Sequence, residues 1–96
     1  MMRTKVIYEG RSEDCRYSTF NFVINGKGDF GNGGYWTDEE CDVAMSLARY
    51  ISEHTDSPEP VFEGETVWFI YEDKYGIMDW KEEVMEAYRE WKQLNR

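Results

Sequence analysis

Alternating apolar and polar positions predict two β-strands in the first quarter of the chain. Residues 3–9 are rich in β-branched and aromatic side chains, which are typical of strands, and residues 10–14 form a polar turn after them. Residues 16–24 then alternate, so that every second side chain near the end of this strand is apolar. The apolar set on one face of this second strand comprises Phe20, Phe22 and Ile24.

A helical period replaces the alternation after Thr37. Thr37 is a preferred N-cap residue, and Glu40, three positions later, completes a capping box. Apolar side chains then recur three and four residues apart until about His54, and the prolines within residues 55–60 cannot continue a helix. The predicted buried face of this helix comprises Val43, Ala44, Leu47, Ala48 and Ile51.

Residues 65–72 predict a further strand, one with apolar side chains on both faces. This pattern indicates either a strand that is covered on both sides or one whose second face is an interface. A turn at residues 73–74 would add a short partner strand at residues 75–78. The two apolar faces comprise Val67, Phe69 and Tyr71 on one side and Trp68 and Ile70 on the other.

A second helix is predicted to begin at Asp79, an N-cap residue with Glu82 in the capping-box position. Its apolar stripe comprises Trp80, Val84, Ala87, Trp91 and Leu94.

These elements predict one α+β domain over residues 1–96. Its small antiparallel sheet is built from an N-terminal hairpin and a later strand or hairpin, with two helices packed against it. The element order is ββ(β)αβα, in which the bracketed strand is a short one near residues 29–30.

The glycine-rich stretch of residues 25–34, NGKGDFGNGG, raises the question of nucleotide binding. Gly26, Gly28 and Gly31 match the dinucleotide-binding pattern G-x-G-x-x-G, in which the glycines join a strand directly to a helix. Here the helix begins only after Thr37, and the Asn-Gly pair that opens the stretch is the strongest short signal for a reversing hairpin. We therefore expect a glycine loop that binds no nucleotide.

Candidate catalytic and metal-binding groups are few. His54 is the only histidine, and Cys15 and Cys41 lack the paired spacing of a metal site. No serine lies in a nucleophile-elbow pattern, and a nucleophile would need a neighbouring base. We expect no enzyme activity, no metal and no cofactor. Cys41 borders the apolar face of the first helix and is expected to be a small buried hydrophobe.

The cellular setting follows from what the sequence lacks. Two cysteines are too few for a disulfide scaffold, the first ten residues hold no apolar leader, and no apolar run approaches the length of a membrane span. We expect a cytoplasmic protein.

Negative charge is concentrated after Thr37. Residues 1–37 hold four acidic and five basic side chains, a net charge of +1, whereas residues 38–96 hold sixteen acidic and six basic side chains, a net charge of −10. Direct binding of nucleic acid is disfavoured, because it requires basic surface against phosphate. A solvated acidic face that only prevents association is one interpretation, and recognition of a basic partner is the other.

A row of glutamates on the second helix favours a partner. Glu82, Glu86 and Glu90 recur every four residues, a spacing at which like charges destabilise a helix by roughly 0.2–0.5 kcal/mol per pair. A helix selected only for solubility would more often alternate its charges. The predicted partner-binding residues are Glu82, Glu83, Glu86, Glu90, Asp38, Asp42, Glu72 and Asp73.

Two functions remain open on the sequence alone. The first is a small acidic interaction domain that binds a basic surface of a larger protein. In size and charge the chain is similar to the small acidic inhibitors of phages and mobile elements, some of which mimic DNA phosphates and occupy restriction or CRISPR enzymes. The second is an accessory or regulatory domain that makes mainly apolar contacts through exposed aromatic side chains such as Tyr35, Trp36 or Trp68.

Overall fold

The computed structural model describes residues 3–13, 16–28, 34–55, 57, 59–64, 66–70 and 80–95. Several sequence-based predictions lie outside these residues: the short strands at residues 29–30 and 75–78, the placement of Tyr71 on the same face as Val67 and Phe69, the cap at Asp79, and the partner-binding residues Glu72 and Asp73.

The strands form one antiparallel sheet in the order β1-β2-β4-β3. β1 (Thr4–Arg11) and β2 (Tyr17–Ile24) make the predicted N-terminal hairpin, and β4 (Thr66–Ile70) adds to the other edge of β2. β3 (Pro60–Glu63) completes the sheet beyond β4. The predicted fold class, an antiparallel sheet with two helices, is confirmed.

β3 was not predicted, and its place in the chain explains why. It precedes β4 and pairs with it through a turn at Gly64, whose φ is +62°. Its four residues are too few for a periodic signal, and it begins with a proline, which within sheets is confined to strand starts, edges and bulges. A short edge strand opened by proline is read from the sequence as a loop.

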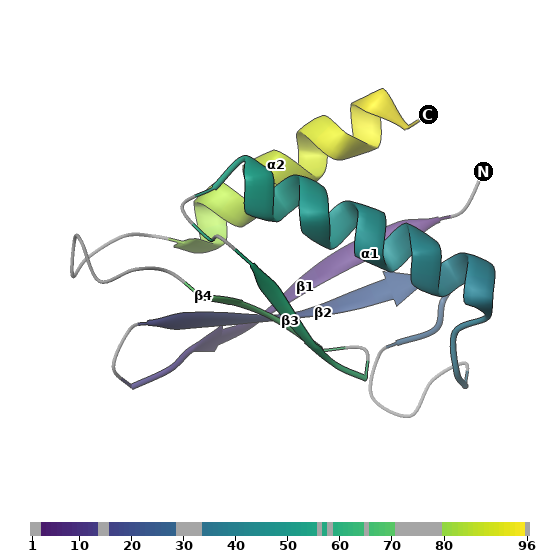
Figure 1. The fold of residues 1–96 in the computed structure, drawn as a ribbon, viewed down its shortest axis with the longest axis horizontal. Coiled ribbons are helices and arrows are strands. Elements are labelled where there is room, and N and C mark those ends of the chain that lie inside the picture. Colours follow the sequence, from purple (N-terminus) through teal and green to yellow (C-terminus); the bar gives the residue numbers. More distant parts are fainter. Residues whose placement is uncertain are drawn as a thin grey trace.

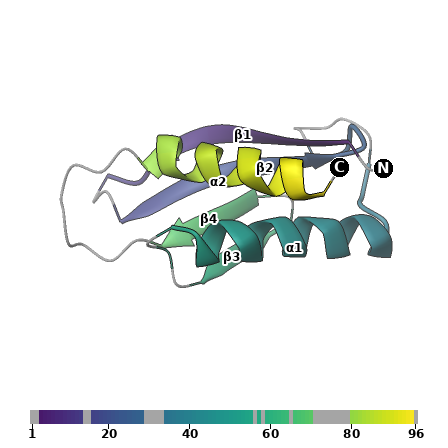
Figure 2. The ribbon, with the colours of Figure 1, turned by 90° about the horizontal axis from the view of Figure 1, so that it is seen from above.

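Both helices lie on the same face of the sheet (Figures 1 and 2). α1 (Asp38–Glu53) begins with the predicted capping box, in which Thr37 Oγ1 accepts from the Glu40 amide, and it is capped at its other end by His54. α2 (Trp80–Leu94) runs antiparallel to α1 and lies over the β1 side of the sheet (Figure 2).

The core lies between the helices and one face of the sheet. Phe20, Phe22 and Ile24 of β2 are fully buried, as the alternation predicts, and Val67 and Phe69 of β4 join them. The helices contribute the buried side chains Ala44, Leu47, Ala48, Ile51, Trp80, Val84, Ala87, Tyr88 and Trp91.

Two burial predictions were wrong, and two core residues, Val6 and Tyr88, were not predicted. Leu94 is 71% exposed, although Trp91, three residues earlier in the same predicted stripe, is buried. Cys41 is exposed, since it lies at the edge of the α1 stripe on the side away from the core. Tyr88 is buried instead, and its hydroxyl donates to the Thr4 carbonyl at 2.7 Å, which ties α2 to β1.

Candidate functional site

The glycine stretch opens with a reversing turn. Asn25 and Gly26 both have positive φ, 53° and 80°, as the two central residues of a type I′ turn require. The amides and carbonyls of Ile24 and Lys27 bond to each other across the turn at 2.9 and 3.0 Å. The predicted hairpin entry is confirmed. That no nucleotide binds to this stretch stays a prediction.

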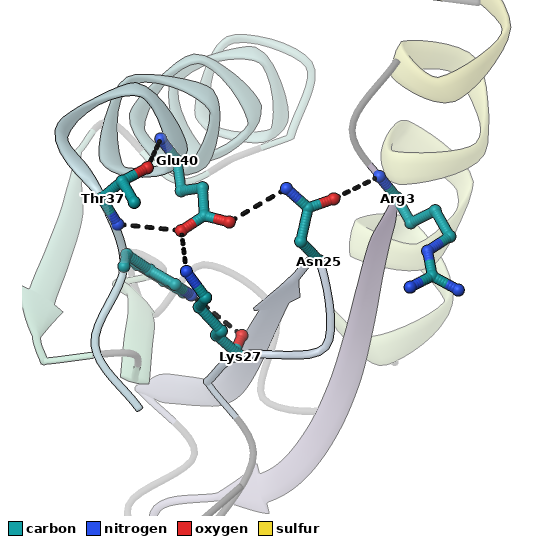
Figure 3. A network of polar contacts seen from close by, with 6 residues as sticks. Arg3, Asn25, Lys27, Thr37 and Glu40 are labelled. Carbon is teal, nitrogen blue, oxygen red and sulfur yellow. Dashed lines mark hydrogen bonds and ion pairs between the residues drawn. The ribbon is translucent and has the colours of Figure 1, made fainter. Parts of the chain in front are cut away.

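A polar network holds this turn against the N-terminus of α1 (Figure 3). The Glu40 carboxylate, 3% exposed, accepts from Lys27 Nζ at 2.8 Å, from Asn25 Nδ2 at 2.9 Å and from the Thr37 amide at 2.8 Å. Asn25 Oδ1 in turn accepts from the amide of Arg3 at 3.1 Å. One carboxylate therefore joins the helix start, the turn and the beginning of β1.

These donors lower the pKa of Glu40 from 4.5 to about 2, with the Lys27 hydrogen bond as the largest cause, followed by the bonds from Thr37 and Asn25. The helix N-terminus is a favourable place for an anion. Here the protein's own carboxylate occupies it, which makes this network a structural joint.

We expect Glu40→Gln to alter how stability depends on pH. Because the folded-state pKa lies below 4.5, the ionised carboxylate stabilises the fold above pH 4.5, and this contribution is lost as the pH falls toward 2. Urea midpoints measured from neutral to acid pH should differ at neutral pH and converge in acid. Glu39→Gln, an exposed neighbour, should follow the wild type throughout. A constant gap between wild type and Glu40→Gln would contradict the assignment.

The four glutamates of α2 lie together on one flank of the helix. At 100° per residue they fall within a sector of about 100°, and the three basic residues of α2 fall within a separate sector. Glu82, Glu86 and Glu90 are exposed, while Glu83 is half-buried. We call these four residues the glutamate row. The basic sector comprises Lys81, Arg89 and Lys92.

Contacts on both sides of α2 fix its orientation. The Tyr50 hydroxyl of α1 donates to Glu90 Oε2 at 3.3 Å, so the glutamate row lies on the flank toward α1. On the opposite flank, Lys81 Nζ lies 5.5 Å from the centre of the Tyr8 ring of β1. Glu90 thus lies toward α1 and Lys81 toward β1, while Arg89 lies at the border between the acidic and basic sectors.

Asp38 and Asp42 are exposed on α1, but they do not join the row. Asp42 precedes Tyr50 by eight residues, and Glu82 precedes Glu90 by the same number. Because the helices run in opposite directions, Asp42 lies about 12 Å along them from Glu90, the nearest member of the row, and about 24 Å from Glu82. Both distances exceed the Debye length of about 8 Å at physiological ionic strength. The site therefore reduces to the glutamate row of α2.

Tyr50 is the contact that sequence reasoning missed. Its ring stacks on His54, with centroids 3.9 Å apart and planes 17° apart, and its hydroxyl reaches Glu90. Burial and the neighbouring carboxylate raise the pKa of Tyr50. It lies beside the apolar stripe of α1, where a helical period gives no reason to expect a hydrogen bond to another helix.

The groove between the helices is lined by both acidic and basic side chains. Asp42, Tyr50 and Glu53 line it from α1, and Trp91 lines it from α2. Its end near the C-terminus of α2 is lined by Arg3, Arg89 and Lys92 together with Glu39 and Asp42. A purely cationic ligand would meet these bases at that end. The uniformly acidic surface is the glutamate row itself.

The three aromatic residues of the alternative hypothesis have different environments. Tyr35 is 91% exposed. Trp36 is half-buried, and its Nε1 donates to the Lys27 carbonyl at 2.9 Å, so it covers the turn. Trp68 is half-buried on the sheet face away from the helices, edge-on to Tyr17 at 6.5 Å.

Among the described residues, no three His, Cys, Asp or Glu side chains gather where they could hold a metal ion. Neither described helix is both long and apolar enough to cross a membrane. No family model, curated protein or solved structure matches the chain.

Proposed function

We propose that this protein is a small acidic interaction domain whose glutamate row binds a basic surface of a larger protein. The observation that carries the proposal is the separation of charge on α2. Three exposed glutamates follow one another at four-residue spacing on one flank, with the bases of the helix on the other. Arg89, three residues after Glu86, borders the row but does not lie between its members.

The row costs the helix stability, which a solubilising surface does not require. Each of its two like-charge pairs at i,i+4 opposes helix formation by roughly 0.2–0.5 kcal/mol. The hydrogen bond from Tyr50 holds Glu90 at the end of the row, while Glu82 and Glu86 remain exposed. Two of these carboxylates are thus available to a partner.

The chemistry of the row favours a partner that normally holds phosphates. Successive carboxylates are about 6 Å apart along the helix axis and carry one negative charge each. A groove lined by Lys and Arg for a nucleic-acid backbone would accept such a series. We therefore propose inhibition of a nucleic-acid enzyme by phosphate mimicry, as in the phage-type inhibitors of restriction or CRISPR enzymes. The proposed setting is the cytoplasm, and no catalytic role is proposed.

Reversing one charge of the row should slow association with the partner. Glu86→Lys is the test variant, because Glu86 is exposed, whereas Glu90 also bonds to Tyr50. Glu13→Lys, at an exposed residue after β1, makes the same charge change elsewhere. Proteins captured from a cell extract would be eluted with duplex DNA, identified, purified and measured by surface plasmon resonance at low and high salt.

We expect the association rate of Glu86→Lys to be roughly tenfold lower at low salt, because charge at an interface acts mainly on the encounter, and to approach that of wild type at high salt. Folding should be unchanged or improved by tenths of a kcal/mol, since attraction replaces repulsion. If Glu86→Lys and Glu13→Lys bind alike at both salts, the row is a solvated surface and the aromatic alternative replaces it.

A further inference from the structure

The sheet face opposite the helices carries apolar side chains around a polar centre. On β2 the core side chains alternate with outward ones, and the register carries this outward face across β1, β4 and β3. No helix or strand within the described part of the chain covers it (Figures 1 and 2). Five of its six apolar side chains are half-buried, and Val61 is 39% exposed. This open sheet face comprises Ile7, Tyr17, Val23, Val61, Trp68 and Ile70.

The polar side chains at the centre of this face satisfy one another. Asn21, 3% exposed, donates from Nδ2 to Glu9 Oε1 at 2.7 Å and accepts at Oδ1 from the Thr66 hydroxyl at 3.2 Å. A buried polar group is costly only when its hydrogen bonds are not made. A partner could therefore cover this face without breaking the hydrogen bonds of the Asn21 amide and the Thr66 hydroxyl.

Charge is sparse here, in contrast to the helices. The register and the bond to Asn21 place only Lys5, Glu9 and Glu63 on this side of the sheet among the described charged residues. Two chains of net charge −9 repel each other in most orientations. Contact through the open sheet faces keeps the acidic helix layers of both copies on the outside. The dimer then has four layers in the order helices, sheet, sheet, helices.

We infer that the open sheet face binds a second copy of this chain, sheet against sheet, about a two-fold axis parallel to the strands. This axis places β1 of one copy over β3 of the other, because the two edges exchange sides. Lys5 on β1 and Glu63 on β3 of the other copy then lie on facing strands in both halves of the dimer, offset by two residues, or about 7 Å, along the strands. Extended Lys and Glu side chains can span this diagonal, so each half of the contact brings a base of one copy toward an acid of the other. The inference does not depend on the proposed function.

The size of the face predicts a weak dimer. Four strands about 4.8 Å apart, with five to eight residues in the longer ones, give a flat footprint of roughly 400 Å². Stacked sheets pack about 10 Å apart, with interdigitating side chains that enlarge the contact. Specific interfaces average about 800 Å² per partner, so this contact is at the small end. We expect dimerisation at micromolar or higher concentration.

Sedimentation velocity over protein concentrations from low micromolar to millimolar tests the inference. The wild type should move from 11.5 kDa toward twice that mass. Val61→Lys should weaken dimerisation about tenfold or more, because it places a charge in an apolar contact. Met45→Lys, at a 50% exposed residue of α1, makes the same change of charge on the helix side and should dimerise like the wild type. Val61 is exposed on an edge strand, so its variant should keep the wild-type urea midpoint.

Two further measurements test the geometry. Lys5→Glu alone should weaken the dimer, and Lys5→Glu with Glu63→Lys should restore it. Added salt should strengthen the dimer by screening its net repulsion, the opposite of its effect on binding to a basic partner. A monomer at every concentration, or equal dimerisation of Val61→Lys and Met45→Lys, would overturn the inference. A double variant no stronger than Lys5→Glu would overturn the proposed axis.

Discussion

Trp91→Ala should lower the free energy of unfolding by about 3–5 kcal/mol, the usual cost of truncating a large buried aromatic side chain. Trp91 is 7% exposed and lies in the stripe of α2 that packs into the single core cluster of the described residues. Domains of this size have total stabilities of about 5–15 kcal/mol. The variant therefore loses a large part of what holds the fold.

Urea denaturation followed by circular dichroism measures this effect. For a slope of about 2 kcal/mol per molar urea, the midpoint should fall by roughly 2 M. Leu94→Ala is the matched control, because Leu94 is on the same helix, three residues later, and is 71% exposed. The free energy of unfolding of this control should change by less than about 0.5 kcal/mol. Equal midpoints for the two variants would mean that α2 packs through another face.

The elements that could be predicted from the sequence are those fixed by local chemistry. The capping box of Thr37 and Glu40 sets the start of α1 through two hydrogen bonds within four residues. The Asn25-Gly26 turn is set by two residues that tolerate positive φ. Strand β2 is set by an alternation that only one register can bury. Each of these signals acts within a few residues, so no knowledge of the tertiary fold was needed.

What could not be predicted depends on contacts between distant residues. The capping pattern identifies Glu40 as a helix cap, but its bonds to Asn25 and Lys27 require the turn to fold back onto α1. The bond between Tyr50 and Glu90 joins residues forty positions apart, and it requires the antiparallel packing of the helices. For the same reason the eight predicted partner-binding residues could not be grouped from the sequence, and Asp42 lies far from Glu82.

The apolar pattern of residues 65–72 leaves two interpretations of this strand open, and the structure favours one of them. Val67 and Phe69 point into the core, while Trp68 and Ile70 lie on the face that no described element covers. Of the two interpretations, a strand covered on both sides or one whose second face is an interface, this arrangement favours the second. The sheet and the helix layer thus offer two surfaces of different chemistry, one apolar and one acidic. Salt should affect binding at the two in opposite directions.

Gly28→Ala should strongly destabilise the fold, because a Cβ at this position would clash with the backbone of β2. Gly28 is buried with φ at +113°, and a Cβ there would overlap the Phe22 carbonyl oxygen and come within 3.1 Å of the Trp36 ring. A strained backbone conformation costs about 1–3 kcal/mol, and overpacking costs about 1–3 kcal/mol more. We expect a loss of roughly 3 kcal/mol or more in the free energy of unfolding.

Gly26→Ala separates the two causes. Gly26 also has positive φ, +80°, but no atom lies within 4 Å of a Cβ built on it. Its substitution should cost only the left-handed strain of about 1–2 kcal/mol. The additional loss of unfolding free energy in Gly28→Ala, compared with Gly26→Ala, then measures the contact with Phe22 and Trp36. Adding Trp36→Ala to Gly28→Ala should relieve little of this additional loss, because the closest atom is a backbone oxygen. Equal urea midpoints for the two glycine variants would show that Trp36 and β2 do not close over the turn, and the glycine at position 28 would then be required only for its backbone angle.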